Sequence, residues 1–250
     1  MLSRAARAPD AVVCYGPRAD QIVDLYRAHG AARALVILVH GGYWRPQYDR
    51  VHLRPMAQAL AAAGWTVGLP EYARVPGDPD GMLADVELAV RRLPQLIRQG
   101  DEGVAQGGDR GRVIIAGHSA GGHLALCVAA QAEPLAGASL AGVLALAPVA
   151  DLLQADALNV DDGAVRDFLG EPAAKRPDLD PCRLPAPAMP VTLLHGDADS
   201  FAPQNLSRSY VAVHPQTRAV WLPGAGHFAL IDPQSGVWTV VLEELERLFT

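Results

Sequence analysis

The chain has 250 residues, of which 50% are hydrophobic and 19% charged, and its formal net charge is −6 at pH 7. This composition excludes a disordered chain, and the ordinary charge gives no sign of nucleic acid or an acidic membrane surface as a partner. The length suits one large domain, and no apolar run approaches the length of a membrane span. We therefore expect a compact globular protein.

The cysteines and the N-terminal residues bear on the compartment. Cys14, Cys127 and Cys182 cannot all pair, and they are too scattered for a zinc motif. A cytoplasmic location, where thiols stay reduced, is the simplest expectation. Met1 to Pro9 lack the apolar segment of a secretory signal, and residues 1 to about 14 are predicted to form a loose leader. Cys127 is expected to be a core residue and not a nucleophile.

Apolar runs and helical spacings alternate along the chain. We predict strands at residues 21–26, 34–39, 66–72, 113–117, 139–147, 191–194 and 218–222. We predict helices at residues 51–63, 82–99, 119–128, 204–213 and 233–249. Pro94 is expected to kink or divide the second helix. This order predicts a three-layer α/β fold with a mostly parallel sheet and with ligand chemistry at the carboxyl ends of the strands.

Residues 150–190 differ in character from the rest of the chain. They carry acidic and proline-rich patches, and only residues 165–169 have a helical pattern. We predict a small cap or ordered loop inserted over the carboxyl edge of the sheet, within a single domain that spans residues 1–250. A linker between two domains is the alternative.

The predicted strand at residues 113–117 leads into Gly117-His118-Ser119-Ala120-Gly121. This sequence fits Gly-x-Ser-x-Gly, the pattern of a nucleophile elbow, which lifts a serine hydroxyl above the sheet. The glycines have a physical reason, because a β-carbon two residues before or after the serine would clash in so tight a turn. The helix that follows would place its positive dipole end and free N–H groups beside a developing oxyanion.

Reactive side chains follow four of the predicted strands: His40 to Trp44, Ser119, Asp197 with Asp199, and His227. The chain order of nucleophile, acid and histidine is that of the α/β-hydrolases. We predict that Ser119 attacks, that His227 is the general base and that Asp199 orients the imidazole. Asp199 lies far enough past its strand to reach the histidine loop, whereas Asp197 is interpreted as a turn former.

The loop from His40 to Trp44 is expected to complete the site as an oxyanion hole. We assign the backbone donors to Gly42, Tyr43 and Ala120, because glycine lets N–H groups approach an oxyanion without obstruction. Gly41 is expected to supply flexibility. The mechanism requires no cofactor.

The remaining histidines are given structural roles. His118 and His123 lie five positions apart, which is not the four-residue spacing of a helical zinc site, and we predict no metal site. His40 and His195 are expected to order their own loops through ring hydrogen bonds.

The two loop motifs, His40-Gly41-Gly42-Tyr43-Trp44 and Gly117-His118-Ser119-Ala120-Gly121-Gly122-His123, resemble those of the arylformamidases, or kynurenine formamidases. This branch of the α/β-hydrolases stands close to the hormone-sensitive lipase group of esterases. That group usually has a third glycine where this chain has Tyr43 and often an aspartate where it has His118, so both differences favour the formamidase branch. Gly122 stands where formamidases often have alanine, which keeps the identity of the substrate open.

The resemblance extends from about Tyr15 to Ile231, and it assigns the same triad and oxyanion loop. It implies hydrolysis of N-formyl-L-kynurenine to formate and L-kynurenine in tryptophan catabolism. Tyr43, Trp44 and His118 are the candidate substrate contacts. The first two would stack on the aniline ring, and Arg45 or a cap arginine would meet the carboxylate. The alternative for Trp44 is a packing residue that supports the oxyanion loop.

Three functions therefore stay open. A formamidase-like serine hydrolase leads, a general short-acyl carboxylesterase is the alternative, and a catalytically idle binding protein with a hydrolase fold is a distant third. The expected partner is a small-molecule substrate. The sequence leaves the oligomeric state open, with a homodimer among the alternatives.

Overall fold

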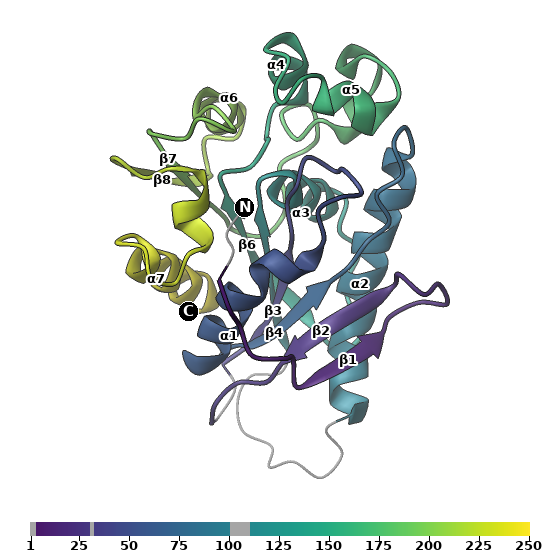
Figure 1. Ribbon diagram of the computed structural model, residues 1–250, viewed down its shortest axis with the longest axis vertical. Helices are drawn as coiled ribbons and strands as arrows, with labels where there is room; N and C mark the ends of the chain where they lie inside the picture. The colour runs from purple at the N-terminus through teal and green to yellow at the C-terminus, as the bar shows by residue number, and fades with distance from the viewer. Residues whose placement is uncertain (1–3, 31–32, 101–110) are drawn as a thin grey trace.

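The computed structural model describes residues 4–30, 33–100 and 111–250 (Figure 1). Within these ranges, eight strands form one sheet in the order β1-β2-β4-β3-β5-β6-β7-β8. The strands are β1 Ala11–Cys14, β2 Ile22–Tyr26, β3 Leu35–Val39, β4 Thr66–Pro70, β5 Arg112–His118, β6 Ser139–Leu146, β7 Val191–Gly196 and β8 Arg218–Leu222.

The sheet is parallel from β4 to β8, and only β1 and β2 run antiparallel to their neighbours. Every residue of β3 and β7 is buried, which explains why these strands read as continuous apolar runs. Alternate residues of β3 contribute to different cores, with Ile37 in one and Val36 and Leu38 in the other. The predicted mostly parallel sheet is confirmed.

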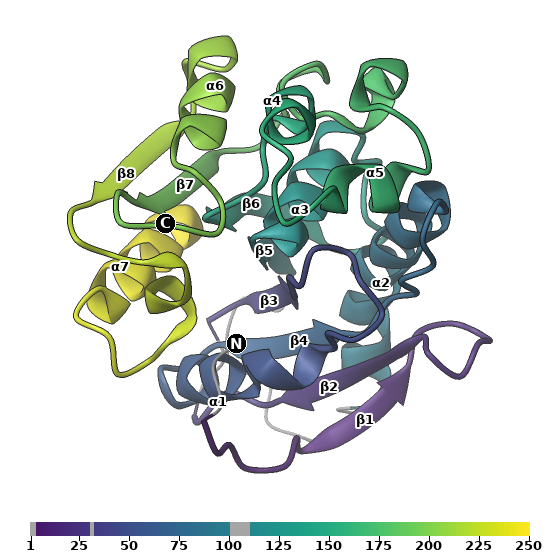
Figure 2. The ribbon, with the colours of Figure 1, turned by 45° about the horizontal axis from the view of Figure 1, so that its top comes forward.

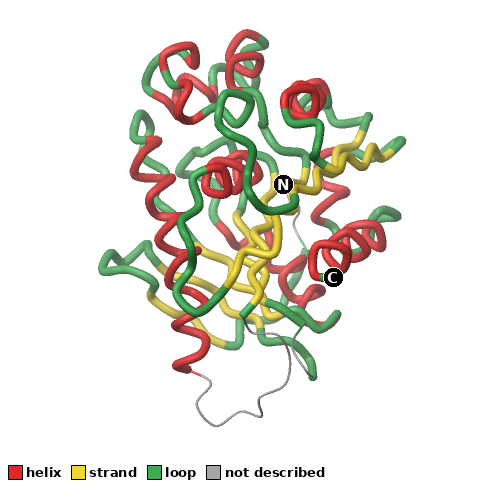
Figure 3. Tube along the Cα trace, turned by 180° about the vertical axis from the view of Figure 1, so that it is seen from behind, coloured by secondary structure: helices red, strands yellow, loops and turns green. Residues whose placement is uncertain are grey.

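Helices cover both faces of the sheet. They are α1 Arg54–Ala62, α2 Pro79–Gly100, α3 Ala120–Ala130, α4 Leu152–Ala157, α5 Ala164–Leu169, α6 Asn205–Val213 and α7 Trp238–Phe249. The buried side chains of α2 and α3 belong to one core, and those of α1 and α7 belong to the core on the opposite face. Figures 2 and 3 show the strands between these two sets of helices. None of the described helices is both long and apolar enough to cross a membrane.

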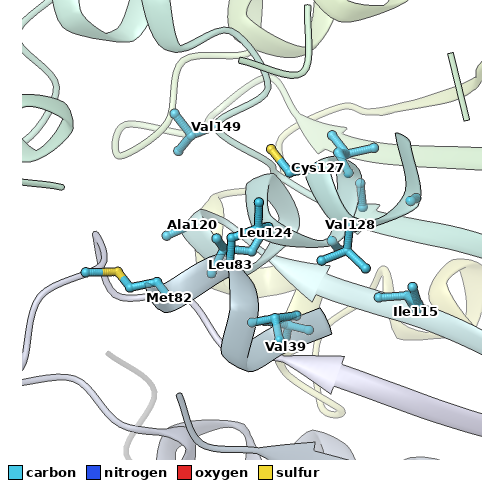
Figure 4. Close-up of a cluster of buried hydrophobic side chains, with 14 of the residues drawn as sticks. Val39, Met82, Leu83, Ile115, Ala120, Leu124, Cys127, Val128 and Val149 are labelled. Carbon is cyan, nitrogen blue, oxygen red and sulfur yellow. The ribbon is translucent and has the colours of Figure 1, made fainter. Parts of the chain in front are cut away.

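Helix α3 begins directly after the candidate nucleophile Ser119 and holds it in place. Its residues from Ala120 to Ala129 are all buried, as is typical of a helix that is apolar on every side. Figure 4 shows Leu124 and Val128 of this helix among side chains of the neighbouring strands and of α2. Cys127 is also fully buried, and burial raises the pKa of its thiol well above the usual value. It is a core residue, as predicted.

Helix α2 continues without a break through Pro94, so the proline does not divide it, although proline removes one backbone hydrogen bond there. The buried side chains of Val90 and Leu93 hold this part of the helix against the core. Ala11–Cys14 do not belong to a loose leader, because they pair with β2 as an edge strand. Four residues are too few for a period of two to be recognised.

The insertion at residues 150–190 is ordered. It contains α4 and α5, which lie together at the top of Figure 1, and two short 3₁₀ turns, Ala173–Lys175 and Pro177–Leu179. Val165 and Phe168 of α5 belong to the same hydrophobic core as the side chains of α3. The insertion is therefore a small cap packed on the body of the fold.

Leu245 tests the packing of α7. Its side chain is fully buried in the core between α7 and the sheet. Leu245→Ala is therefore expected to lower the free energy of unfolding by about 2–5 kcal/mol, measured by urea titration with fluorescence detection. The matched control is Leu153→Ala, at a leucine that is 46% exposed, for which we expect a change below about 0.5 kcal/mol. Equal losses in the two variants would contradict the assignment.

Candidate active site

Ser119 lies in a strained turn between β5 and α3. Its φ of 57° and ψ of −119° are values that residues with a side chain rarely adopt. Glycines make the turn sterically feasible: a β-carbon on Gly117 would clash with the carbonyl oxygen of Gly121, and one on Gly121 would clash with that of Val39. The geometry is that of a nucleophile elbow.

Asp199 and His227 come together from the loops after β7 and β8. His227 Nδ1 donates to Asp199 Oδ2 at 2.6 Å, and both side chains are buried. Because the carboxylate can only accept, the proton of the imidazole must lie on Nδ1. In the neutral ring, Nε2 is then unprotonated and able to accept the proton of a serine.

The Asp199 carboxylate has further donors. Its Oδ1 accepts from the backbone N–H groups of Phe201 at 2.8 Å and Ala202 at 2.9 Å, and its Oδ2 lies 3.3 Å from His195 Nε2. Burial on its own raises the pKa of Asp199, but the hydrogen bonds from His195 and His227 outweigh burial and hold this pKa well below the usual range. Asp199 is therefore ionised at neutral pH.

His195 orders the turn after β7 that carries Asp199, here called the acid turn, as expected. Its Nε2 donates to the carbonyl oxygen of Ala202 at 2.8 Å, so its Nδ1 accepts from the hydroxyl of Ser207 at 2.6 Å in the neutral ring. Asp197, the second candidate acid, is exposed and accepts from the backbone N–H of Gly224 at 2.7 Å. Gly224 lies in the loop after β8, so among the described residues Asp197 joins two loops and does not bond to its own turn as predicted.

The loop after β3 lies directly against the elbow. A β-carbon on Gly41 would lie 2.7 Å from the carbonyl oxygen of His118 and 3.0 Å from Cβ of Ser119. Glycine is therefore needed at this position for close approach, and the predicted flexibility stays a prediction.

The three candidate oxyanion donors flank this contact. Gly42 and Tyr43 follow Gly41 with φ values of 117° and 55°, and Ala120 is the first residue of α3. Among the hydrogen bonds of the described residues, none uses the backbone N–H of Gly42, Tyr43 or Ala120. An N–H group at the first turn of a helix has no partner within the helix. These amides stay our candidates for binding an oxyanion.

Trp44 is placed in the core and not at an open surface. Its ring is 2% exposed and stacks on Phe168 of the cap, with the ring centroids 4.5 Å apart and the planes at 14°. Its edge meets His123 at a centroid distance of 5.2 Å. One face of the indole is thus already occupied, and the packing role explains the structure better than the predicted stacking on a substrate.

His118, another candidate substrate contact, lies beside the candidate base His227. Its Nε2 donates to the backbone carbonyl of His227 at 3.0 Å, and the two ring centroids are 4.4 Å apart. Burial holds the pKa of His118 well below its usual value, so the ring is neutral. Its contact with a substrate stays a prediction. So does that of Tyr43, which is partly buried and whose phenol pKa burial raises.

Arg45, the candidate for a substrate carboxylate, is already paired with the cap. Its guanidinium lies 2.5 Å from Asp161 Oδ2 and 3.2 Å from Asp167 Oδ2. The cap arginines are also bound to carboxylates: Arg166 to Asp156, Arg176 to Asp80 and Asp178, and Arg183 to Asp180. A substrate carboxylate would have to displace one of these ion pairs.

Phe201 is a residue that the sequence analysis missed. Its side chain is 44% exposed, and its ring stacks on His227 with centroids 5.5 Å apart and planes at 29°. An exposed aromatic ring against the candidate base is an apolar surface that a substrate could contact. Its position two residues after the candidate acid Asp199 is the feature of the sequence that could have placed it at the site.

Comparison with known proteins agrees with this geometry. Residues 36–180, more than half of the chain, match the family described as alpha/beta hydrolase fold. The chain belongs to the α/β-hydrolase family. This α/β-hydrolase is 27% identical to esterase LipC of Mycobacterium tuberculosis, over 88% of its own length and 60% of the relative's. It is 26% identical to esterase LipQ of the same species, over 79% and 51%.

The chain therefore spans little more than half the length of these curated relatives. Among solved structures, esterase B from Lactobacillus rhamnosis is 24% identical with a TM-score of 0.76, and 98% of this chain and 87% of that one are covered. A carbohydrate esterase from gut microbiota is 17% identical with a TM-score of 0.76, with 97% and 98% covered. At such identities, the likeness shows the fold, and the formamidase branch stays a prediction.

The two aspartates of the acid turn provide a matched test. Asp199→Asn is expected to lower kcat/KM for p-nitrophenyl butyrate about 10⁴-fold, because an amide cannot hold the imidazole in the required tautomer or stabilise its charged form. Asp197 directly follows the same strand, and its side chain accepts from the backbone N–H of Gly224 in the loop after β8. Because the amide oxygen of asparagine can also accept this bond, Asp197→Asn is expected to stay within about threefold of the wild type. Similar losses in both variants, at unchanged melting temperature, would reject Asp199 as the acid.

Trp44→Phe separates packing from substrate binding. Since the indole packs against Phe168, we expect KM for p-nitrophenyl butyrate and for N-formylkynurenine to change by less than about twofold, while the melting temperature falls. A rise in KM for the aromatic substrate alone, with the aliphatic esters unaffected, would restore the stacking role.

Proposed function

We propose that the protein is a serine carboxylesterase that cleaves short-acyl esters. The observation that carries the proposal is the 2.6 Å hydrogen bond from His227 Nδ1 to Asp199, on the same edge of the sheet as the strained elbow of Ser119. A serine hydroxyl is nearly inert at neutral pH, and an oriented neutral imidazole is the group that it needs. The esterase names of the curated relatives support the same function.

The proposed reaction has two halves. His227 Nε2 takes the proton of Ser119 as its oxygen attacks the ester carbonyl, and Asp199 stabilises the imidazolium that forms. The imidazolium then gives the proton to the leaving alcohol, which leaves Ser119 acylated. Water, activated by the same imidazole, releases the acid and restores the serine. In both tetrahedral intermediates, the N–H groups of Gly42, Tyr43 and Ala120 are proposed to bind the oxyanion.

Hydrolysis of N-formyl-L-kynurenine is the second candidate function, and the two loop motifs favour it. The ion pairs of the cap weigh against it as the main activity. Kynurenine carries a carboxylate, whereas Arg45 and the three cap arginines already have carboxylate partners. A neutral ester has no carboxylate and therefore needs no arginine to bind it.

The deciding measurement is kcat/KM for p-nitrophenyl acetate and butyrate beside N-formylkynurenine. We expect the esters to exceed the formamide by at least about 10²-fold, which corresponds to about 2.7 kcal/mol of transition-state binding. The opposite ratio would make the protein an arylformamidase. Ser119→Ala is the control, and turnover at the wild-type level in that variant would reject Ser119 as the nucleophile and overturn both functions. No turnover of any of these substrates by the wild type would instead favour the idle hydrolase fold.

A further inference from the structure

The carboxylate of Glu71 is buried directly after β4. The residue is 6% exposed, and it follows the apolar strand that ends at Pro70. A buried carboxylate is costly unless hydrogen bonds and opposite charges compensate for the lost water. The partners of the Glu71 carboxylate therefore indicate its role in the structure.

Glu71 contacts both ends of the loop that carries the candidate oxyanion donors. Its Oε1 lies 3.0 Å from His40 Nε2, at the start of this loop. Its Oε2 accepts from the backbone N–H of Arg50 at 3.2 Å and from its guanidinium at 3.3 Å, at the end of the loop. One side chain thus bridges the two ends of a segment that includes Gly42 and Tyr43.

Tyr72, the next residue, fixes the same end of the loop by different contacts. Its ring stacks on the His40 ring, with centroids 4.4 Å apart and planes at 21°. Its hydroxyl donates to the backbone carbonyl of His40 at 2.9 Å. The backbone immediately before Gly41 is therefore held by both Glu71 and Tyr72.

The bridge is anchored to the sheet through other charges. The Arg50 guanidinium also donates to Asp24 of β2 at 2.9 Å, and Arg54 donates to the same carboxylate at 2.7 Å. Arg74 forms a second ion pair with Glu71. Because Asp24 is fully buried, this network ties the oxyanion loop to the rigid antiparallel part of the sheet.

We propose that Glu71 is a positioning residue, which holds the loop from His40 to Arg50 so that the N–H groups of Gly42 and Tyr43 face the oxyanion formed at Ser119. The inference rests on the proposed function, in which those groups are the oxyanion donors. A donor that is displaced loses its interaction with the transition state more than with the bound ester, so loosening the loop lowers kcat and leaves KM almost unchanged.

The test compares Glu71→Gln with Asp85→Asn. Asp85 is a matched control, because it is also a buried carboxylate: it pairs with Arg18 and accepts from Gln21 at 2.8 Å and from the backbone of Ala73 at 3.0 Å. We expect Glu71→Gln to lower kcat for p-nitrophenyl butyrate by about 10- to 10²-fold with KM within about threefold. For Asp85→Asn, we expect kcat to stay within about threefold of the wild type, even if its melting temperature falls as much as that of Glu71→Gln.

A second readout does not depend on activity. Hydrogen exchange of the backbone amides at residues 41–49, measured by mass spectrometry, is expected to become faster in Glu71→Gln and to stay unchanged in Asp85→Asn. If Glu71→Gln does not fold, Tyr72→Phe keeps the stacked ring and removes only the hydroxyl bond to His40. It is expected to lower kcat by about three- to tenfold.

Ser119→Ala separates the two proposals. If it abolishes turnover while Glu71→Gln and Tyr72→Phe keep the wild-type kcat and exchange rates, the positioning role is overturned and the proposed function stands. If Ser119→Ala keeps its turnover, the proposed function itself fails. Equal losses of kcat in Glu71→Gln and Asp85→Asn would also overturn the positioning role, since they would show a general effect of losing a buried charge.

Discussion

The close approach of three backbone segments around Ser119 is the constraint on which the rest of the site depends. The elbow turns sharply only because Gly117 and Gly121 have no β-carbon, and the loop after β3 reaches it only because Gly41 has none. The strain of the Ser119 backbone is held by the buried strand before it and the fully buried helix after it. The proposed catalysis would therefore depend on the packed core on both sides, because a looser turn would let Ser119 relax out of its position.

The parallel sheet brings together residues that lie far apart in the sequence. The loops after β3, β5, β7 and β8 leave the same edge of the sheet, so residues as far apart as Gly41 and His227 lie at one candidate site. The order of strands places β5 between β3 and β6, which sets the proposed nucleophile between the proposed oxyanion loop and the loops of the proposed acid and base. Each loop is then fixed by its own buried polar contacts, His40 and Glu71 on one side and His195 on the other.

Sequence reasoning recovers what depends on local pattern. Buried strands are visible as apolar runs, and the elbow is visible because its glycines are required at fixed spacing. Features decided by distant contacts are not visible in this way. Helix α2 tolerates Pro94 because the core holds the helix, and Trp44 is buried because Phe168 of the cap covers it. Glu71 left one trace, a charge directly after an apolar strand, but its partners at both ends of a loop could not be read from the chain.

The shared carboxylate of Asp199 links the chemistry of the site to the acid stability of the fold. Its pKa in the folded protein is held below the value of about 3.9 expected in the unfolded chain. Such a group stabilises the native state at any pH above its unfolded pKa, and this contribution is lost as the pH falls through the folded value. Acid therefore weakens the contact between the loops after β7 and β8, because protonation of Asp199 disrupts its hydrogen bond with His227. The same protonation would remove the acceptor that holds the proposed base His227 in its tautomer, so the proposed chemistry and part of the stability of the fold depend on one carboxylate.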